Sequence, residues 1–166
     1  DLGGGTDRLT LAGAANTVTV SNIETVTGGA SADIITIGTT SAVTISAGGG
    51  NDTITSGQGA DTFTLAAGND VLVFTNTNQS TTSAKDTVTD FNAAGDILSF
   101  SGLEVGTFDF VGSGAFTGGS DNSEASFNDS TKVLSVDVNG DGTAEMQINL
   151  TGVSLANLSE ADFLWT

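Results

Sequence analysis

Large apolar residues recur at a regular interval in the first half of the chain, most of them between two polar residues. Alternate side chains of a strand point to opposite faces, so the apolar residue of each triplet is expected to point inward. The inward positions predicted in this way are Leu9, Val18, Val26, Ile35, Ile45, Ile54, Phe63 and Leu72. A column of β-branched and large apolar side chains is typical of stacked, buried parallel strands.

The segments between these predicted strands are rich in glycine and carry an acid at a fixed place. Asp52, Asp61 and Asp70 are nine residues apart, and each follows a glycine by two positions. The three glycines are Gly50, Gly59 and Gly68. This is the Gly-Gly-x-Gly-x-Asp-x-apolar-x pattern of calcium-binding parallel β-helix repeats. Glycine permits a positive φ, and calcium prefers carbonyl and carboxylate oxygens, so the loops are expected to bind calcium.

These residues resemble the hemolysin-type (RTX) repeats. The resemblance implies a β-roll in which two nonapeptides form one coil and calcium binds between alternate, stacked loops. One side then stacks Asn16, Asp33, Asp52 and Asp70, and the other stacks Asp7, Glu24, Val43 and Asp61. The best sites are expected between the loops of Asp52 and Asp70 and between those of Asp33 and Asp52, because Val43 interrupts the other side.

The periodicity stops at Phe74, and a polar segment, residues 75–83, follows. Residues 85–103 resemble the segment that closes the roll in serralysin-type C-terminal domains. The matching positions are Asp86, Val88, Asp90, Phe91, Gly95, Asp96 and Ile97. The resemblance implies that Asp86 helps to ligate calcium at the end of the roll. The expected domains are a β-roll over 1–73, a loop over 74–84 and a closing β-sandwich over 85–166.

The expected fold class is therefore all-β, a right-handed parallel β-roll followed by an antiparallel β-sandwich-like cap. Phe108, Phe110, Phe116 and Phe127 are expected to supply aromatic residues to the core of this cap. The predicted calcium ligands are Asp33, Gly48, Gly50, Asp52, Gly57, Gly59, Asp61, Gly68, Asp70 and Asp86, with Asp7, Asp137, Asn139 and Asp141 as lesser candidates.

Alternating apolar residues flank an Asn-Gly-Asp-Gly turn at 139–142, which indicates a β-hairpin. Asp137, Asn139 and Asp141 also match the first half of an EF-hand loop. Ile148, however, stands where that loop requires its bidentate glutamate, and helical flanks are absent. A plain hairpin turn is therefore favoured over a calcium site at this point.

The last residues read LSEADFLWT, in which Ser159 is expected to cap a short helical turn through Phe163. The ending Asp162, Phe163, Leu164 and Trp165 resembles the uncleaved C-terminal signal of proteins exported by type I secretion systems. The resemblance implies that the type I secretion machinery is a partner. Because Asp1 opens in the middle of a repeat, the chain is expected to be the C-terminal part of a longer protein.

Charge and composition narrow the function further. Twenty acidic residues against three basic ones give a net charge of −17, which argues against nucleic-acid binding and opposes compaction unless a cation neutralises it. Histidine and cysteine are absent, so the usual nucleophile–base pairs and an ordinary zinc site are excluded. Because calcium loops explain the acids, no enzyme active site is expected, and no segment is apolar for long enough to span a membrane.

The function predicted from these features is a calcium-dependent folding and type I export module of a secreted or cell-surface protein from a Gram-negative bacterium. The threonine-rich coils resemble those of surface-layer and adhesin proteins, so assembly of the chain into a surface lattice is one expectation for the parent protein. A secreted enzyme, such as a metalloprotease, a lipase or an epimerase, is the alternative. Thr-x-Thr pairs leave ice binding as a further alternative, although Ile34 and Arg8 interrupt the two faces.

Overall fold

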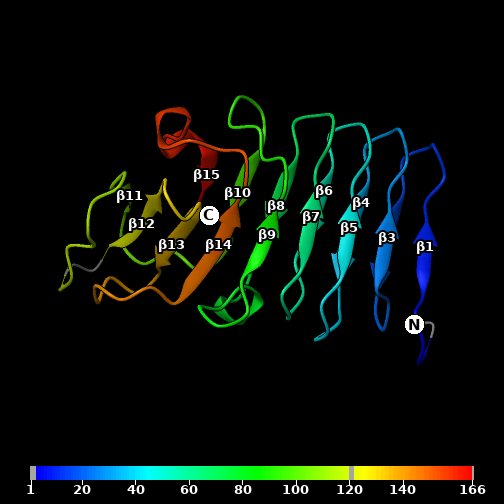
Figure 1. Ribbon diagram of the computed structural model, residues 1–166, viewed down its shortest axis with the longest axis horizontal. Coiled ribbons are helices and arrows are strands. Elements are labelled where there is room, and N and C mark those ends of the chain that lie inside the picture. Colours follow the sequence, from blue (N-terminus) through cyan, green and yellow to red (C-terminus); the bar gives the residue numbers. More distant parts are fainter. Residues whose placement is uncertain (1–2, 120–121, 166) are drawn as a thin grey trace.

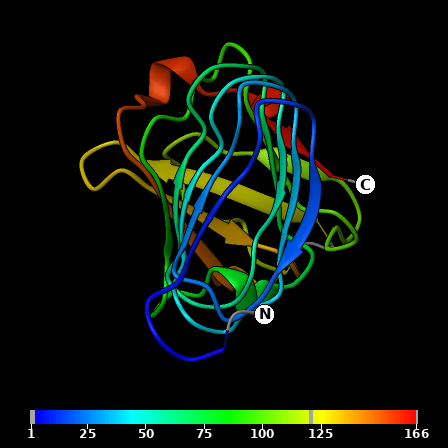
Figure 2. The ribbon, with the colours of Figure 1, turned by 90° about the vertical axis from the view of Figure 1, so that its right-hand side faces the viewer.

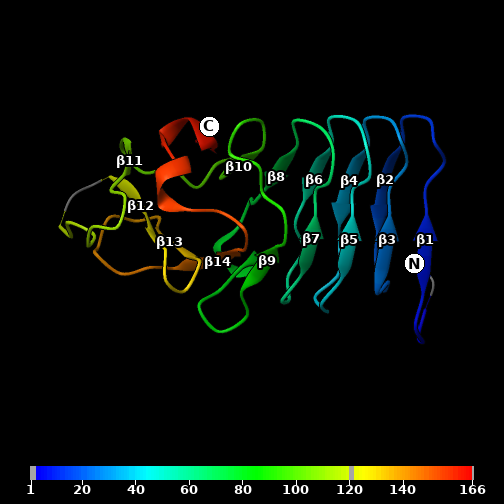
Figure 3. The ribbon, with the colours of Figure 1, turned by 45° about the horizontal axis from the view of Figure 1, so that its top comes forward.

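The apolar triplets form short strands that stack into two parallel sheets. The computed structural model describes residues 3–119 and 122–165. One stack contains β1 (Arg8–Thr10), β3 (Thr25–Thr27), β5 (Thr44–Ser46), β7 (Thr62–Thr64) and β9 (Asp86–Val88). The other contains β2 (Thr17–Val20), β4 (Ile34–Ile37), β6 (Thr53–Thr55), β8 (Val71–Val73) and β10 (Ile97–Ser99). The coils follow one another along the long axis of the molecule (Figures 1 and 3).

The predicted inward residues pair with one another across neighbouring coils. Leu9 pairs with Val26 and Val26 with Ile45, so the short repeat and the long repeat compensate and the column continues. Val26, Ile35, Ile45, Ile54, Phe63 and Leu72 are all fully buried. Leu9 and Val18, in the end coil, are only partly buried. Viewed along the roll, the coils overlie one another (Figure 2), as the predicted two-repeat coil requires.

Both parallel stacks continue beyond residue 73. The segment after β8 contains a short 3-10 helix, η1 (Thr77–Gln79), and then β9 pairs with β7, placing Val88 beside Phe63. β10 pairs in the same way with β8, placing Leu98 beside Leu72. Two aperiodic segments thus supply one further coil with the same inward packing as the repeats.

The cap extends the sheet that contains β9. β14 (Met146–Leu150) lies parallel to β9, and β13 (Val133–Asp137) pairs with β14 as an antiparallel hairpin. β12 (Ser123–Asn128) is antiparallel to β13, and β11 (Phe108–Phe110) is parallel to β12. The predicted hairpin and the predicted fold class are therefore confirmed (Figure 1).

The C-terminal strand closes the other sheet. After η2 (Leu155–Asn157) and η3 (Glu160–Asp162), β15 (Phe163–Leu164) pairs in parallel with β10. Ser159 stands at the predicted position before the helical turn, where its N–H and hydroxyl both donate to Asp162 Oδ2. The ring of Trp165 stacks on Phe100 and Phe108, with centroid separations of 4.6 and 4.4 Å.

The predicted aromatic core of the cap needs one correction. Phe127 is fully buried, and Phe108 and Phe110 pack against the core. Phe116 is only half-buried and lies outside the core, because it falls in a loop between β11 and β12. Phe74 and Phe100, which the periodicity does not single out, are fully buried and stack on each other. Within residues 3–119 and 122–165, no helix is long and apolar enough to cross a membrane.

Candidate metal centre

The acidic positions lie in two columns, one along each row of loops. The upper loops in Figure 1 lead from odd-numbered to even-numbered roll strands and carry the upper column, Asn16, Asp33, Asp52, Asp70 and Asp96. The lower loops carry the lower column, Asp7, Glu24, Val43, Asp61 and Asp86. The structure thus places the loop residues of the predicted repeats on the predicted sides.

Hydrogen bonds link successive members of each column. In the upper column, the N–H groups of Asp33 and Asp52 donate to the Oδ1 atoms of Asp52 and Asp70, each at 2.7 Å. In the lower column, the N–H of Val43 donates to Asp61 Oδ1 at 2.8 Å. Each carboxylate therefore reaches back to the preceding coil through one oxygen, which fixes its orientation.

The second oxygen of three of these carboxylates has no partner. The Oδ2 atoms of Asp52, Asp61 and Asp70 are buried and accept no hydrogen bond, although the residues are at most 1% exposed. Desolvation raises the pKa of Asp61, and the nearby Ser56 hydroxyl and Gly57 N–H offset this shift only in part. Neither group forms a hydrogen bond with Asp61 Oδ2. Buried carboxylates are normally paired or coordinate a metal. These three oxygens are therefore candidate ligands for a cation.

The glycines bring neighbouring loops into close contact. Gly48 and Gly50 have positive φ values of 102° and 107°, and Gly59 has one of 125°. A Cβ atom on Gly68 would overlap the carbonyl oxygen of Gly50 in the loop below. A Cβ atom on Gly57 would approach the Thr39 carbonyl oxygen to 2.8 Å. The predicted glycines thus allow the backbones of adjacent coils to lie in close contact.

Burial makes the ionised form of the column unfavourable. The pKa of Asp70 is raised to about 6, first by desolvation and then by the charges of Asp96, Asp52 and Asp90. Desolvation also raises the pKa of Asp52, and the neighbouring charge of Asp33 adds to this shift. The pKa of Asp61 is raised by desolvation as well. A bound divalent cation would reverse these penalties, because it favours the deprotonated ligand.

Asp33 differs from the other acids of the upper column. Its Oδ1 accepts hydrogen bonds from the N–H and the side-chain amide of Asn16, and its Oδ2 accepts one from the N–H of Gly29. Desolvation opposes ionisation, but the hydrogen bonds from Gly29 and Asn16 outweigh it and lower the pKa of Asp33. The ionised Asp33 is therefore stabilised by the protein itself.

Asp86 ends the lower column in a network of hydroxyl groups. Its Oδ1 accepts the N–H of Asp61 and its Oδ2 accepts the Ser56 hydroxyl, each at 2.8 Å. The Ser80 hydroxyl accepts the Asp86 N–H and donates to the Gln147 carbonyl. Desolvation, followed by the charge of Asp61, raises the pKa of Asp86 to about 8. The structure thus places Asp86 in the lower column as predicted, but with both oxygens already bonded.

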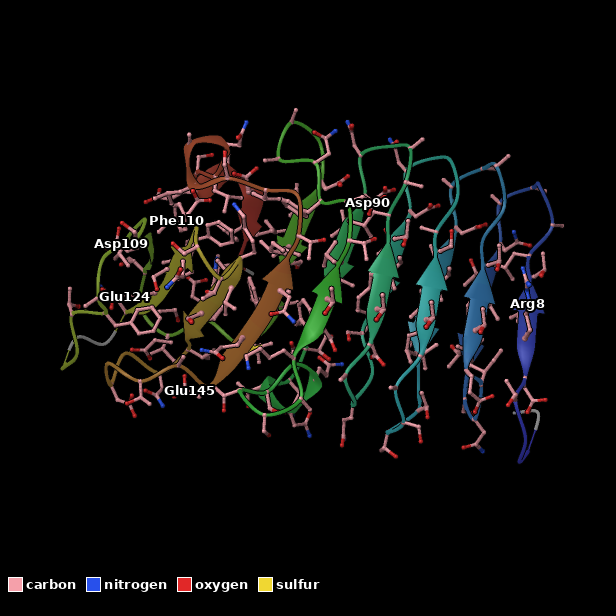
Figure 4. All side chains as sticks on the ribbon, viewed as in Figure 1. Arg8, Asp90, Asp109, Phe110, Glu124 and Glu145 are labelled. Carbon is pink, nitrogen blue, oxygen red and sulfur yellow. The ribbon has the colours of Figure 1, made fainter. Side chains whose placement is uncertain are left out.

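The upper column ends in a loop that is not a repeat. Asp96 Oδ1 accepts the Asp70 N–H and Asp96 Oδ2 accepts the Asn92 N–H. Asp90 lies at the upper end of β9 (Figure 4) and accepts the N–H groups of Leu65 and Ala66. Asp90 and Asp96 thereby fix the loop that carries Asp70, a role that the nonapeptide pattern alone does not reveal.

The lesser candidates occupy two other places. Asp7, in the first coil, has a buried Oδ2 without a partner, although the residue is partly exposed. At the hairpin turn, carboxylate oxygens of Asp137, Asp141 and Glu145 lie within 4.8 Å of one another. Both oxygens of Asp137 accept backbone N–H groups, from Gly140 and Gly142. Asn139 does not offer its oxygen to this cluster, since that oxygen accepts the Asp141 N–H.

Glu145 was not predicted from the sequence. It lies at the lower end of the hairpin (Figure 4), where it accepts the N–H of Val138 and the side-chain amide of Asn139. Glu145 lies close to Asp137 and Asp141 because of the way the hairpin closes. The spacing of an EF-hand loop points instead to Ile148. Ser56 and Ser80 were missed for a similar reason, because contacts with Asp86 bring them together from segments far apart.

The columns fit calcium better than any other common cofactor. Calcium takes six to eight oxygen ligands in flexible geometry, from carboxylates and backbone carbonyls. The roll offers the unpaired oxygens of Asp52, Asp61 and Asp70, in glycine-rich loops that stack closely on the neighbouring coils. Histidine and cysteine, which soft metals prefer, are absent from the sequence.

Comparison with known proteins finds a matching family model and a similar solved structure. The family model described as peptidase M10 serralysin C terminal matches residues 2–165, which is nearly the whole chain. The comparison with curated proteins finds no match. Among solved structures, the AlgE6R2 subunit from the Azotobacter vinelandii mannuronan C5-epimerase is similar, with 20% sequence identity and a TM-score of 0.47. The alignment covers 97% of this chain and 92% of that one.

Proposed function

Since the chain belongs to the peptidase M10 serralysin C-terminal family, we propose that it is a calcium-binding RTX module of a secreted protein and that, near neutral pH, it folds only when calcium is bound. The observation that carries this proposal is the set of three buried, unpaired carboxylate oxygens on Asp52, Asp61 and Asp70. Without a cation these groups oppose folding, because burying an unpaired charge is costly.

The net charge of the chain supports the same conclusion. A charge of −17 repels itself in the compact state, and only three basic residues are available to offset it. Lys132 forms an ion pair with Asp129 at the surface, far from the columns in the sequence. Calcium would therefore supply both a partner for the unpaired oxygens and much of the charge neutralisation that the fold requires. Binding free energy is then folding free energy.

A calcium requirement suits a protein that is exported before it folds. Free calcium in the cytosol is too low to occupy sites of extracellular type, whose dissociation constants are about 10⁻⁴–10⁻³ M. The chain would remain unfolded during export and fold outside the cell. We propose type I secretion as the route, with the ending Asp162, Phe163, Leu164 and Trp165 as the segment that the exporter recognises, and a Gram-negative bacterium as the source.

Two classes of parent protein are compatible with this module. Threonine-rich outward faces support a surface-layer or cell-surface parent, in which calcium-loaded rolls assemble laterally. The family description, which names a peptidase, supports instead a secreted enzyme whose catalytic part lies elsewhere. Electron microscopy of the calcium-loaded module separates the two, because ordered sheets at high concentration favour the surface layer and discrete monomers favour the enzyme module.

Circular dichroism during a calcium titration tests the proposed function. We expect little β-structure in chelator, a cooperative gain as calcium rises, and no comparable gain with magnesium, which demands octahedral geometry and dehydrates reluctantly. Asp52→Ala and Asp70→Ala should each shift the midpoint to higher calcium. A chain that is equally folded in chelator would refute the proposal.

A further inference from the structure

Six aspartates of the two columns are almost completely buried, but they do not share one environment. Asp33, Asp52, Asp61, Asp70, Asp86 and Asp96 are each at most 3% exposed. All six are acceptors for the backbone N–H of a neighbouring coil through Oδ1. They differ only at Oδ2, and this difference divides them into two groups of three.

The first group lies in the regular nonapeptides. Asp52, Asp61 and Asp70 each leave Oδ2 buried and without a partner. The loop of each contains a glycine with positive φ two positions before the acid, namely Gly50, Gly59 and Gly68. Close approach of neighbouring backbone accompanies all three glycines. Among the residues that the structure describes, none donates a hydrogen bond to these three oxygens.

The second group lies where the regular pattern begins or ends. Asp33 Oδ2 accepts the Gly29 N–H at 3.0 Å, and Asp96 Oδ2 accepts the Asn92 N–H at 2.8 Å. Asp86 Oδ2 accepts the Ser56 hydroxyl at 2.8 Å. Each of these carboxylates thus has both oxygens bonded by protein donors, as a buried acid requires in the absence of a metal.

We infer that the two groups have different roles: Asp52, Asp61 and Asp70 ligate calcium, whereas Asp33, Asp86 and Asp96 are hydrogen-bonded stops that end the columns without ligating it. The inference rests on the proposed calcium-dependent folding and reduces the number of residues that are expected to ligate calcium. It removes Asp33 and Asp86 from the ligands expected from the sequence. The distinguishing feature is the hydrogen bond at Oδ2, donated by Gly29, Ser56 or Asn92, which Asp52, Asp61 and Asp70 do not receive.

Neighbouring acids of one column provide matched variants. Asp61→Asn and Asp86→Asn change adjacent members of the lower column, and Asp70→Asn and Asp96→Asn do so in the upper column. Asparagine keeps one acceptor oxygen and the side-chain shape, but it loses the carboxylate charge. The Ser56 hydroxyl can accept as well as donate, so Asp86→Asn retains a hydrogen bond at this position.

Calcium stoichiometry by equilibrium dialysis, with circular dichroism at saturating calcium as a check of folding, tests the inference. Asp61→Asn and Asp70→Asn are each expected to lose one or more calcium equivalents relative to the wild type. Asp86→Asn and Asp96→Asn are expected to keep the wild-type number, although Asp96→Asn should melt at a lower temperature. Loss of calcium in Asp86→Asn, or its full retention in both Asp61→Asn and Asp70→Asn, would overturn the assignment.

Ser56→Ala keeps the test decisive if a variant of Asp86 does not fold. The substitution removes the donor at Asp86 Oδ2 and leaves the carboxylate in place. If Asp86 is a stop, the calcium-saturated protein should melt at a clearly lower temperature. If Asp86 ligates calcium instead, the loss of the hydroxyl should leave the melting temperature nearly unchanged. Wild-type folding without calcium would refute the proposed function, whereas these comparisons concern only the ligand set.

Discussion

Single buried carboxylates decide how the calcium-free chain responds to pH. The folded-state pKa is raised to about 6 for Asp70 and to about 8 for Asp86, from an ordinary value of 3.8. A raised pKa means that the folded state holds the proton more tightly than the unfolded state. The resulting stability is fully present below the unfolded pKa and is lost as the pH rises through the folded values.

We therefore expect acid to replace part of the calcium requirement. In calcium-free buffer, the β-structure detected by circular dichroism should be greatest near pH 5 and should be lost as the pH is raised to about 8.5. In saturating calcium this loss should disappear, since the cation favours the ionised ligands. Circular dichroism at one temperature across this pH range, in both buffers, measures the effect. A calcium-free β-structure content that rises with pH would contradict the assigned burial of these acids.

Two adjacent glycines of one loop provide a second prediction at this scale. Gly50 has a φ of 107°, and a Cβ atom there would overlap backbone atoms of Ser31 and Ala32. Gly49 has no positive φ, and a Cβ atom there would lie 3.7 Å from the nearest heavy atom, the Ala30 carbonyl oxygen. Gly50→Ala should cost about 1–3 kcal/mol or more, from strain alone.

Gly49→Ala is the matched control and should change stability by less than about 1 kcal/mol. Urea unfolding at saturating calcium compares the two variants. Similar losses in both would show that the loop tolerates neither side chain, and that the close approach at Gly50 is not what limits it. A loss confined to Gly50→Ala would support the close stacking of loops that the candidate calcium sites require.

Secondary-structure elements differ in how far the sequence predicts them. The roll strands follow from local patterns, because most triplets place one apolar residue between two polar ones, and the column from Leu9 to Leu72 is confirmed. The hairpin of β13 and β14 follows from its turn residues. These features depend only on residues that are close in sequence, which is why they are predictable.

The remaining elements depend on contacts between distant segments. The pairing of β14 with β9 and of β15 with β10 joins segments about 60 residues apart, and no periodicity in the sequence predicts these pairings. The donors at Asp86 come from Ser56 and Asp61, which an aperiodic loop brings beside it. Phe116 was wrongly placed in the core because an aromatic residue in a loop has no pattern that shows its burial.

The C-terminal strand provides a prediction at the scale of an element. Phe163 is 6% exposed and contacts Phe108 and Phe110, whereas its neighbour Leu164 is 43% exposed. Phe163→Ala should destabilise the calcium-loaded protein by about 3 kcal/mol or more, since it leaves a cavity in the core. Leu164→Ala should change the stability by less than about 0.5 kcal/mol.

Urea unfolding measured through the fluorescence of Trp165, the single tryptophan, reports on the same region. Equal effects of the two substitutions would contradict the pairing of β15 with β10. The packing of Phe163 that this difference would reveal also concerns export. The ending proposed as an export signal is packed into the sheet once the module has folded, so an exporter would have to recognise it beforehand.

At the scale of the whole molecule, the two ends of the roll are not equivalent. At one end, β1 and β2 are edge strands whose inward residues remain partly exposed. At the other end, β14 covers the edge of β9 and β15 covers the edge of β10 (Figures 1 and 3). The cap thus covers the edges of β9 and β10, at the end of the roll where the core is most completely buried. Exposed sheet edges are a known route to aggregation.

This asymmetry predicts opposite results for two truncations. In a solenoid each coil contacts mainly its neighbours, so removing residues 1–20 should cost only the contribution of one coil. The shortened chain keeps Asp52, Asp61, Asp70 and the cap, and calcium should still fold it. Removing residues 103–166 should abolish calcium-induced folding, because it uncovers both edges and exposes Val88, Leu98 and Phe100, all fully buried in the intact chain.

Circular dichroism with calcium and light scattering of the two truncated chains decide between these outcomes. The chain without β1 and β2 should remain dispersed and gain β-structure at a calcium concentration close to that of the intact protein. The chain without the cap should stay unfolded or aggregate at every calcium concentration. The reverse result would mean that the open end of the roll, and not the cap, is needed for calcium-induced folding. The expected result would show that the coils with the candidate calcium ligands, which lie nearest the cap, need the cap in order to fold.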